Sequence, residues 1–296
     1  MANYSSGTAT AKNKIIDIIT ELAQNNIETT VFPVIPSRHL TSEEILGDIE
    51  FDFDGVICLG GDGTLHHLIN TLQKEGIDVP IGYFPTGSTN DFAYSLYGTR
   101  NPDYNDVIKY IADNNVVEHD LGSFNDYYFN YIAAFGAFTH VSYDTDQSVK
   151  NALGYLAYVI NALGNLPDAL KTRTHAVIEA NGEVIDDYFL MGGISNTTSI
   201  GGMDVPIINH ADLSDGLFEV TLITSPKNVL ELNDIATQII SGNITSPLVR
   251  HFMTDSMKIT FDEEVSWTLD GENGGKWSHA DISIMPSKQK MFVKRK

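Results

Sequence analysis

The chain has 296 residues, of which 42% are hydrophobic and 19% charged, a composition that excludes a disordered chain and suits two domains. Asp and Glu total 39 against 18 Lys and Arg, giving a formal net charge of −21 that argues against nucleic acid as a partner. No stretch reaches the roughly 18 apolar residues of a membrane span, and the N-terminal segment lacks the apolar core of a signal peptide. The single cysteine, Cys58, excludes an internal disulfide and favours a reducing, cytoplasmic compartment.

The first third of the chain alternates predicted strands with predicted helices. Two of the apolar strand patterns end in turns that contain glycine, and each of these turns is followed by a helical pattern. This order predicts a doubly wound, mostly parallel α/β sheet with its ligands at the carboxyl ends of the strands. The strands are expected at 30–34, 53–59 and 79–84, and the helices at 14–22, at 65–73 and from Asp91 onward.

The sharpest motif is Gly60-Gly61-Asp62-Gly63-Thr64, which lies between the strand at 53–59 and a helix that starts near Leu65. Glycine lets backbone amides approach a phosphate closely, and the helix adds its N-terminal N–H groups and the positive end of its dipole. Asp62 can orient a nucleotide hydroxyl or a metal-bound water, and Thr64 can cap the helix. The alternative is a plain strand-to-helix turn, but three glycines with Asp and Thr in this order favour a phosphate-binding loop.

A second polar loop, Gly87-Ser88-Thr89-Asn90-Asp91, follows the next strand. Taken alone, it is equally well explained as the N-cap of a helix. Because the carboxyl ends of neighbouring parallel strands meet at one edge of a sheet, we expect the two loops to form a nucleotide crevice together.

From about residue 120 the pattern changes to many strands with few helices, which predicts a β-rich, sandwich-like second domain. We therefore expect a nucleotide-binding domain at 1–119, to which the tail 287–296 returns, and a substrate domain at 120–286. Strands are expected at 127–138, 174–180, 188–195, 217–223, 257–261 and 282–285, and helices at 152–163 and 227–240.

Two acidic segments in the second domain are candidates for chemistry. Asp212 and Asp215 precede a strand and can hold a hard cation together with the backbone carbonyl of Leu217; the alternative is a solvated turn. Asp270-Gly271-Glu272 can supply a base for a hydroxyl group; the alternative is an ordinary Asp-Gly hairpin turn.

These motifs resemble the diacylglycerol kinase catalytic family of bacterial lipid kinases, which also includes sphingosine kinases and is distantly similar to NAD kinases. The run Gly60–Thr64 followed by Gly87–Asp91 is typical of the lipid branch, and the resemblance extends through the Asp-Gly-Glu segment near the end of the chain. The N-terminal phosphate loop departs from the family pattern. Only Asn3, Ser6 and Gly7 match, Tyr4 replaces a proline, and almost no strand precedes them.

The resemblance implies ATP as the phosphate donor and a structural Mg²⁺ at Asp212, Asp215 and the carbonyl of Leu217. It implies Glu272 as the proton acceptor, assisted by Asp270, with Asp270 itself as the alternative base. The nucleotide would be held by Gly60, Gly61, Asp62, Gly63, Thr64, Leu65, Gly87, Ser88, Asn90, Asn3, Ser6 and Gly7.

The expected function is transfer of the γ-phosphate of ATP to a lipid alcohol, first of all diacylglycerol, in phospholipid biosynthesis. Phosphatidylglycerol, a sphingoid base and an undecaprenol-like alcohol remain open as acceptors. The alternatives are an NAD-type kinase and a catalytically silent nucleotide-binding regulator. We expect a cytoplasmic enzyme with transient, peripheral contact to a membrane surface, with a homodimer as one possible assembly.

Overall fold

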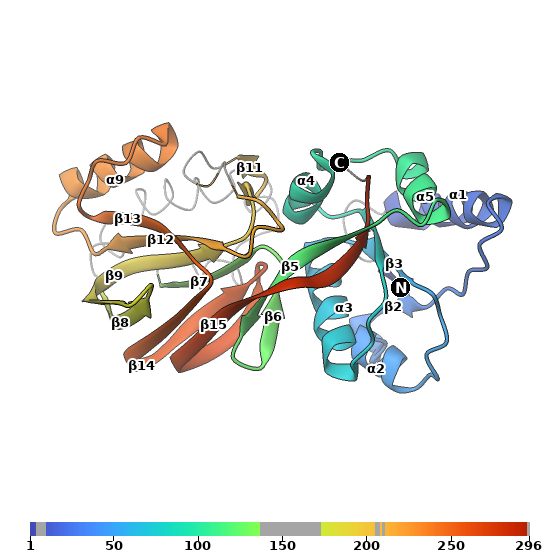
Figure 1. Ribbon diagram of the computed structural model, residues 1–296, viewed down its shortest axis with the longest axis horizontal. Coiled ribbons are helices and arrows are strands. Elements are labelled where there is room, and N and C mark those ends of the chain that lie inside the picture. Colours follow the sequence, from blue (N-terminus) through green and yellow to red (C-terminus); the bar gives the residue numbers. More distant parts are fainter. Residues whose placement is uncertain (4–9, 137–172, 205–207, 209–210, 295–296) are drawn as a thin grey trace. The chain divides into compact units, whose positions relative to one another are not determined.

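The computed structural model describes residues 1–3, 10–136, 173–204, 208 and 211–294, so the expected helix at 152–163 and the residues Ser6 and Gly7 lie outside the described part. The chain forms two compact units, one of Met1–His119 with Ser287–Lys296 and the other of Asp120–Pro286 (Figure 1). Each unit is described by itself below.

The first unit is built on a parallel sheet in the order β4-β3-β1-β2. These strands are β1 (Ala2–Asn3), β2 (Pro33–Val34), β3 (Val56–Gly60) and β4 (Ile81–Pro85). The C-terminal end of β15 (Glu272–Phe292) adds a further parallel partner to β4, with Met291 opposite Ile81. Strand β1, which ends at Asn3, is only two residues long, yet it lies inside the sheet between β2 and β3.

Helices cover both faces of this sheet, as expected of a doubly wound fold (Figure 1). One group packs Ile18 and Leu22 of one helix and Val107 and Ile108 of another against Leu59 and Phe84 of the sheet. The helices are α1 (Thr10–Gln24), α2 (Ser42–Gly47), α3 (Asp62–Glu75), α4 (Asp91–Tyr97) and α5 (Tyr104–Ala112). Helix α2 begins with a capping box in which Thr41 and Glu44 satisfy each other's backbone N–H groups.

The second unit is an antiparallel sheet in the order β13-β12-β9-β7-β14-β15, with β8 pairing both β9 and β14. Its core holds fully buried aromatic residues, among them Phe129, Phe135, Phe218 and Trp267. The elements are β5 (Val116–Phe124), β6 (Tyr127–Phe129), β7 (Ile132–Gly136), β8 (Thr174–Ala180), β9 (Glu183–Ser195), β10 (Ser199–Ile200), β11 (Met203–Asp204), β12 (Phe218–Thr224), α9 (Val229–Ser241), β13 (Val249–Thr254), β14 (Ser256–Leu269) and β15.

Several strand predictions differ from the structure in their bounds. The expected strands at 257–261 and 282–285 are parts of the long hairpin β14–β15. The apolar pattern of β14 stops at the exposed residues 262–264, where the pairing with β15 shifts register, but the pairing resumes at Val265, so the sequence pattern underestimates the strand. The expected strand at 127–138 is interrupted after Phe129, because the backbone of Asn130 and Tyr131 turns toward the β14–β15 turn.

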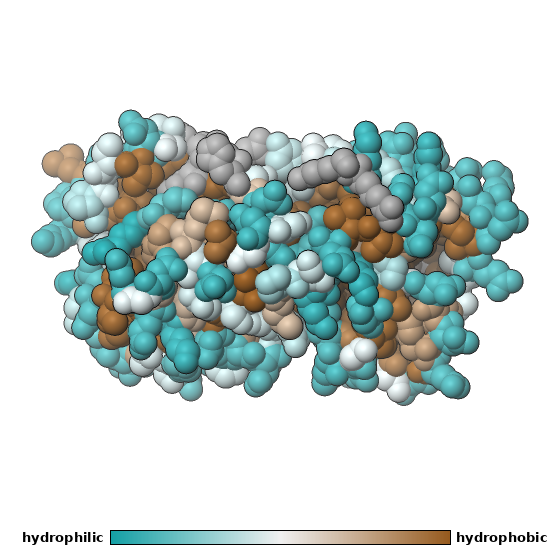
Figure 2. Space-filling view, viewed as in Figure 1, coloured by the Kyte–Doolittle hydropathy of each residue, from teal (hydrophilic) through white to brown (hydrophobic). Residues whose placement is uncertain are grey.

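The face shown in Figure 2 is mostly hydrophilic, in keeping with the acidic composition. Among the described helices, none is long and apolar enough to cross a membrane.

Candidate functional site

The Gly60–Thr64 segment forms the turn from β3 into α3, with Gly61 at the N-cap position and no side chain capping the helix. The glycines are needed because the second polar loop comes into contact here. A Cβ atom on Gly87 would lie 2.9 Å from the Cα of Gly61, and a Cβ on Gly61 would lie 3.1 Å from the Cα of Gly87. Larger residues would push the loops apart, so the sequence brings two backbones together at a helix N-terminus, which is a ready anion-binding geometry.

Asp62 joins the two loops. Its Oδ1 accepts a hydrogen bond from the hydroxyl of Tyr83 at 3.1 Å, and its Oδ2 accepts from the backbone N–H of Asp91 at 3.0 Å. The hydroxyl of Thr89 adds a longer contact to Oδ2, at 3.4 Å. A backbone hydrogen bond of 2.9 Å from the N–H of Thr86 to the carbonyl of Gly60 also connects the two loops. The sequence predicted that the loops would be neighbours, and the structure shows Asp62 as the side chain that holds them together.

Thr64 does not cap helix α3, so this prediction was wrong. The helix already begins at Asp62, which places Thr64 inside its first turn. The Thr64 hydroxyl instead accepts a hydrogen bond from the side-chain amide of Asn3 at 2.9 Å. Thr64 therefore links α3 to the end of β1, and Asn3 lies beside the first glycine loop.

The other predicted nucleotide-binding residues differ in accessibility. Ser88 is exposed, whereas Asn90 is buried and sits at the N-cap position of α4 with φ 53°. The Asn90 side chain does not cap this helix but donates a hydrogen bond to the carbonyl of Arg100 at 3.1 Å. Leu65 is fully buried and its N–H donates to the carbonyl of Gly61, so Leu65 stabilises the loop through packing and this hydrogen bond.

Asp270 and Gly271 form the two-residue turn of the β14–β15 hairpin, with Leu269 opposite Glu272 in the strand register. Their φ values are 53° and 81°, and positive φ at both central residues is the type I′ arrangement that Asp-Gly favours. The alternative explanation of this segment as a hairpin turn is thus correct for its backbone, and it leaves the role of the carboxylates open.

The carboxylate of Asp270 is buried and accepts hydrogen bonds from four donors. Oδ2 accepts from the backbone N–H and the side-chain amide of Asn130, at 2.8 and 3.0 Å. Oδ1 accepts from the backbone N–H groups of Tyr131 and Ile132, at 2.9 and 3.2 Å. Asp270 therefore fixes the β6–β7 connection to the hairpin turn. The neighbouring Glu272 is only half-buried, so its carboxylate is the more accessible of the two.

Asp212 and Asp215 lie in an exposed turn ahead of β12. Oδ1 of Asp212 accepts from the N–H of Ser214 at 3.1 Å, and Oδ1 of Asp215 accepts from the N–H of Leu217 at 3.0 Å. Partial burial raises the pKa of Asp215, and the nearby charges of Asp212 and Asp120 raise that pKa further. Repulsion between carboxylates at this turn is the electrostatic setting in which a cation is favourable.

A further carboxylate, that of Glu219, lies close to this turn and was missed in the sequence analysis. Burial raises the pKa of Glu219 to about 7, and the charges of Asp215 and Asp212 contribute to that rise. The alternation of β12 would have placed Glu219 on one face of the strand, but no sequence pattern shows that this face is buried. In the described part of the chain, no three His, Cys, Asp or Glu side chains are arranged to hold one metal ion directly.

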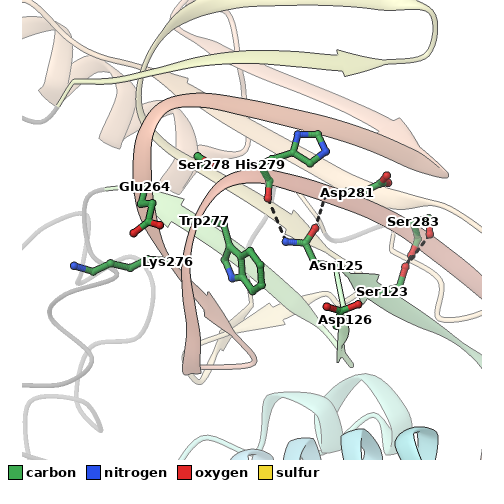
Figure 3. Close-up of a pocket in the computed structure, with 10 residues that line it drawn as sticks. All are labelled: Ser123, Asn125, Asp126, Glu264, Lys276, Trp277, Ser278, His279, Asp281 and Ser283. Atoms are coloured by element: carbon green, nitrogen blue, oxygen red, sulfur yellow. Dashed lines mark hydrogen bonds between the residues drawn. The ribbon is translucent and has the colours of Figure 1, made fainter.

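An open groove of about 670 Å³ lies beside the β14–β15 hairpin in the second unit. Figure 3 shows that the side chain of Asn125 reaches across to β15, where it accepts from the N–H of Asp281 at 2.9 Å and donates to the carbonyl of His279 at 3.2 Å. Sequence reasoning missed this groove because its walls come from segments far apart in the chain. Its lining residues are Ser123, Asn125, Asp126, Glu264, Lys276, Trp277, Ser278, His279, Asp281 and Ser283.

Comparison with known proteins covers nearly the whole chain. Residues 1–124 match the diacylglycerol kinase catalytic domain, and residues 132–293 match the YegS C-terminal NAD kinase beta sandwich-like domain. The chain is 30% identical over 275 residues to a diacylglycerol kinase of Staphylococcus saprophyticus, covering 93% of this chain and 88% of the relative. It is 29% identical over 281 residues to a diacylglycerol kinase of Bacillus subtilis, covering 92% and 88%.

Solved structures confirm the predicted fold class. A diacylglycerol kinase from Bacillus anthracis is similar with a TM-score of 0.69 and 18% identity, over 99% of this chain and 95% of that one. An NAD kinase from Archaeoglobus fulgidus in complex with ATP is similar with a TM-score of 0.54 and 13% identity, over 98% and 91%. The chain belongs to the diacylglycerol kinase family of lipid kinases, and it combines that family's α/β catalytic domain with a β-sandwich-like C-terminal domain.

Proposed function

We propose that this kinase transfers the γ-phosphate of ATP to the free hydroxyl of diacylglycerol and so produces phosphatidic acid. The observation that carries the proposal is the contact between two glycine loops at the N-terminus of α3, held together by Asp62. The similarity to relatives named diacylglycerol kinase supports the acceptor, and the similarity to a kinase solved with ATP supports the donor.

The nucleotide phosphates are assigned to the loop from Gly60 to Thr64, together with Gly87 and the exposed hydroxyl of Ser88. Phosphoryl transfer needs mainly positioning and neutralisation of charge, and backbone N–H groups at a helix start provide both. Asn3 is assigned to the same site because its amide contacts Thr64. Asn90 contributes by fixing the loop, since its side-chain amide is already hydrogen-bonded to the backbone carbonyl of Arg100.

Glu272 is assigned as the proton acceptor for the lipid hydroxyl. A positioned carboxylate contributes typically 10²- to 10⁴-fold as a general base. The four hydrogen bonds to Asp270 occupy its carboxylate oxygens, so Asp270 suits the positioning of the turn better than proton transfer. Glu272 lies directly beside this fixed turn, which supports it as the base.

A Mg²⁺ ion is assigned to Asp212, Asp215 and the carbonyl of Leu217, where it would neutralise the carboxylates and fix the turn before β12. The residues suit a hard cation, because they offer oxygen ligands and because Oε2 of the neighbouring buried Glu219 has no hydrogen-bond partner among the described residues. Contact with a membrane surface follows from the lipid acceptor. In the basic C-terminal tail, Lys290 is paired with Asp78 at 2.7 Å, so its charge is partly neutralised.

The test is a transfer assay with labelled ATP and three acceptors offered in parallel: a total lipid extract, purified diacylglycerol in mixed micelles, and NAD. Labelled phosphatidic acid from the first two supports the proposal. Labelled NADP would show an NAD-type kinase instead, and another labelled lipid would correct the acceptor. ATP binding without any labelled product would point to a nucleotide-binding regulator. A Glu272→Gln variant, analysed in parallel, controls for a contaminating kinase.

A further inference from the structure

Glu219 is a buried carboxylate for which the proposed reaction gives no role. It lies in β12 and is only 3% exposed, and its Oε2 atom has no hydrogen-bond partner within the part of the chain that the structure describes. None of the ion pairs among the described residues includes Glu219. A buried carboxylate oxygen without a hydrogen bond is strongly unfavourable, so this oxygen calls for a partner that the described residues do not supply.

The position of Glu219 in the strand shows where such a partner would lie. Its neighbours Phe218 and Val220 point into the hydrophobic core, so Glu219 lies on the opposite face of β12. The backbone is fixed there, because Glu219 pairs with Ser195 of β9 on one side and with Met253 of β13 on the other. The side chain starts only four residues after Asp215, at the beginning of the strand that the acidic turn leads into.

The charges around this oxygen are negative. Asp215 and Asp212 both act on Glu219, and Asp212 and Asp120 both act on Asp215. A cation held at Asp212 and Asp215 would neutralise several of these negative charges together.

We propose that Glu219 is a positioning residue of the cation site at Asp212 and Asp215, where its Oε2 accepts a hydrogen bond from a water molecule bound to Mg²⁺. We place a water between Glu219 and the ion because no three acidic side chains among the described residues are arranged to hold one ion directly. Mg²⁺ suits this arrangement, since it binds through one or two carboxylates and retains several of its waters. The inference rests on the Mg²⁺ assignment within the proposed function but not on the identity of the lipid.

The experiment measures thermal unfolding of the full chain, without nucleotide or lipid, in increasing MgCl₂ with KCl controls at equal ionic strength. For Glu219→Gln we expect a melting temperature in EDTA at least as high as that of the unmodified protein, because the unpaired charge is gone. We also expect the apparent Mg²⁺ affinity, read from the stabilisation curve, to fall about 10- to 100-fold, as is typical when a partner of a metal-bound group is lost. A role in packing alone would leave that affinity unchanged.

Two further variants separate the outcomes. Asp215→Asn should lose most of the stabilisation by Mg²⁺, because it removes a direct ligand. Glu179→Gln removes an equivalent charge from an exposed position on β8 and should behave like the unmodified protein. Glu219→Met serves as the second substitution if the Gln variant does not fold.

Unchanged Mg²⁺ affinity in a folded Glu219 variant would overturn the proposal. So would a protein that Mg²⁺ does not stabilise at all, and in that case the transfer assay could still succeed, which separates failure of this site from failure of the proposed function.

Discussion

The two turns that carry the sharpest motifs, one in each unit, both use an aspartate to hold a second segment of chain. In the first unit, Asp62 accepts from one backbone N–H and from two hydroxyl groups. In the second unit, Asp270 accepts from three backbone N–H groups and one side-chain amide. Backbone donors cannot rotate away to water when their acceptor is lost, so we infer that Asp270 contributes more to stability than Asp62 does. A motif aspartate can thus serve the site by fixing its neighbours.

The largest expected effect on stability is that of the substitution Asp270→Asn. The amide has only one oxygen acceptor and would direct its NH₂ group at backbone N–H donors, so the free energy of unfolding should fall by about 3 kcal/mol or more. Urea unfolding followed by circular dichroism measures this change. Asp126→Asn, at the exposed tip of the β5–β6 turn, is the matched control and should change stability by less than about 0.5 kcal/mol. A variant of normal stability that has lost turnover would show that Asp270 is the reactive group.

Glu272→Gln should lower activity and leave stability almost unchanged, the reverse of Asp270→Asn. The amide keeps the size of the side chain but cannot accept a proton, so kcat should fall roughly 10²-fold while the KM for ATP stays close to its original value. Stability should change little, because Glu272 is only half-buried. Steady-state kinetics and urea unfolding on the same preparation measure both quantities. If Glu272→Gln keeps most of its kcat, the assignment of the base is wrong.

Tyr83→Phe tests the weaker connection in the first unit. The substitution removes one of the donors to Asp62 and keeps the buried ring, so the free energy of unfolding should fall by about 1 kcal/mol. Differential scanning calorimetry measures the change. A loss as large as that of Asp270→Asn would contradict the inferred difference between the two turns.

The smallest expected effect concerns an exposed pair of aspartates on the second unit. His175 contacts Asp186 and Asp262 at 2.9 Å each, and hydrogen bonding to Asp262 and Asp186 raises the pKa of His175 above its ordinary value of 6.5. A raised histidine pKa stabilises the fold below about pH 6.5, and this contribution is lost as the pH rises through the folded-state pKa. Asp262→Asn should therefore lower the melting temperature by a small amount at pH 6 and not at pH 9. An equal decrease at both pH values would contradict a role for the charged pair.

The sequence alone was sufficient wherever a feature depended on neighbouring residues. The glycine loops follow strands β3 and β4, which pair directly in parallel, so order along the chain already made the loops neighbours. Cys58 lies within an apolar run of the sequence, and the structure shows that it is buried, which raises the pKa of the thiol to about 12.

Only the tertiary structure decided the features that depend on residues far apart in the chain. The partners of Asp270 lie about 140 positions earlier, in the β6–β7 connection. The side-chain amide of Asn3, which donates a hydrogen bond to the hydroxyl of Thr64, lies 61 positions before Thr64. The unpaired oxygen of Glu219 depends in the same way on strands β9 and β13 covering its sides. Local patterns determine turns, helix starts and the faces of strands, because backbone geometry repeats over a few residues. Whether a carboxylate is satisfied, accessible or unpaired depends on which distant segments pack against it, and composition and spacing do not contain that information.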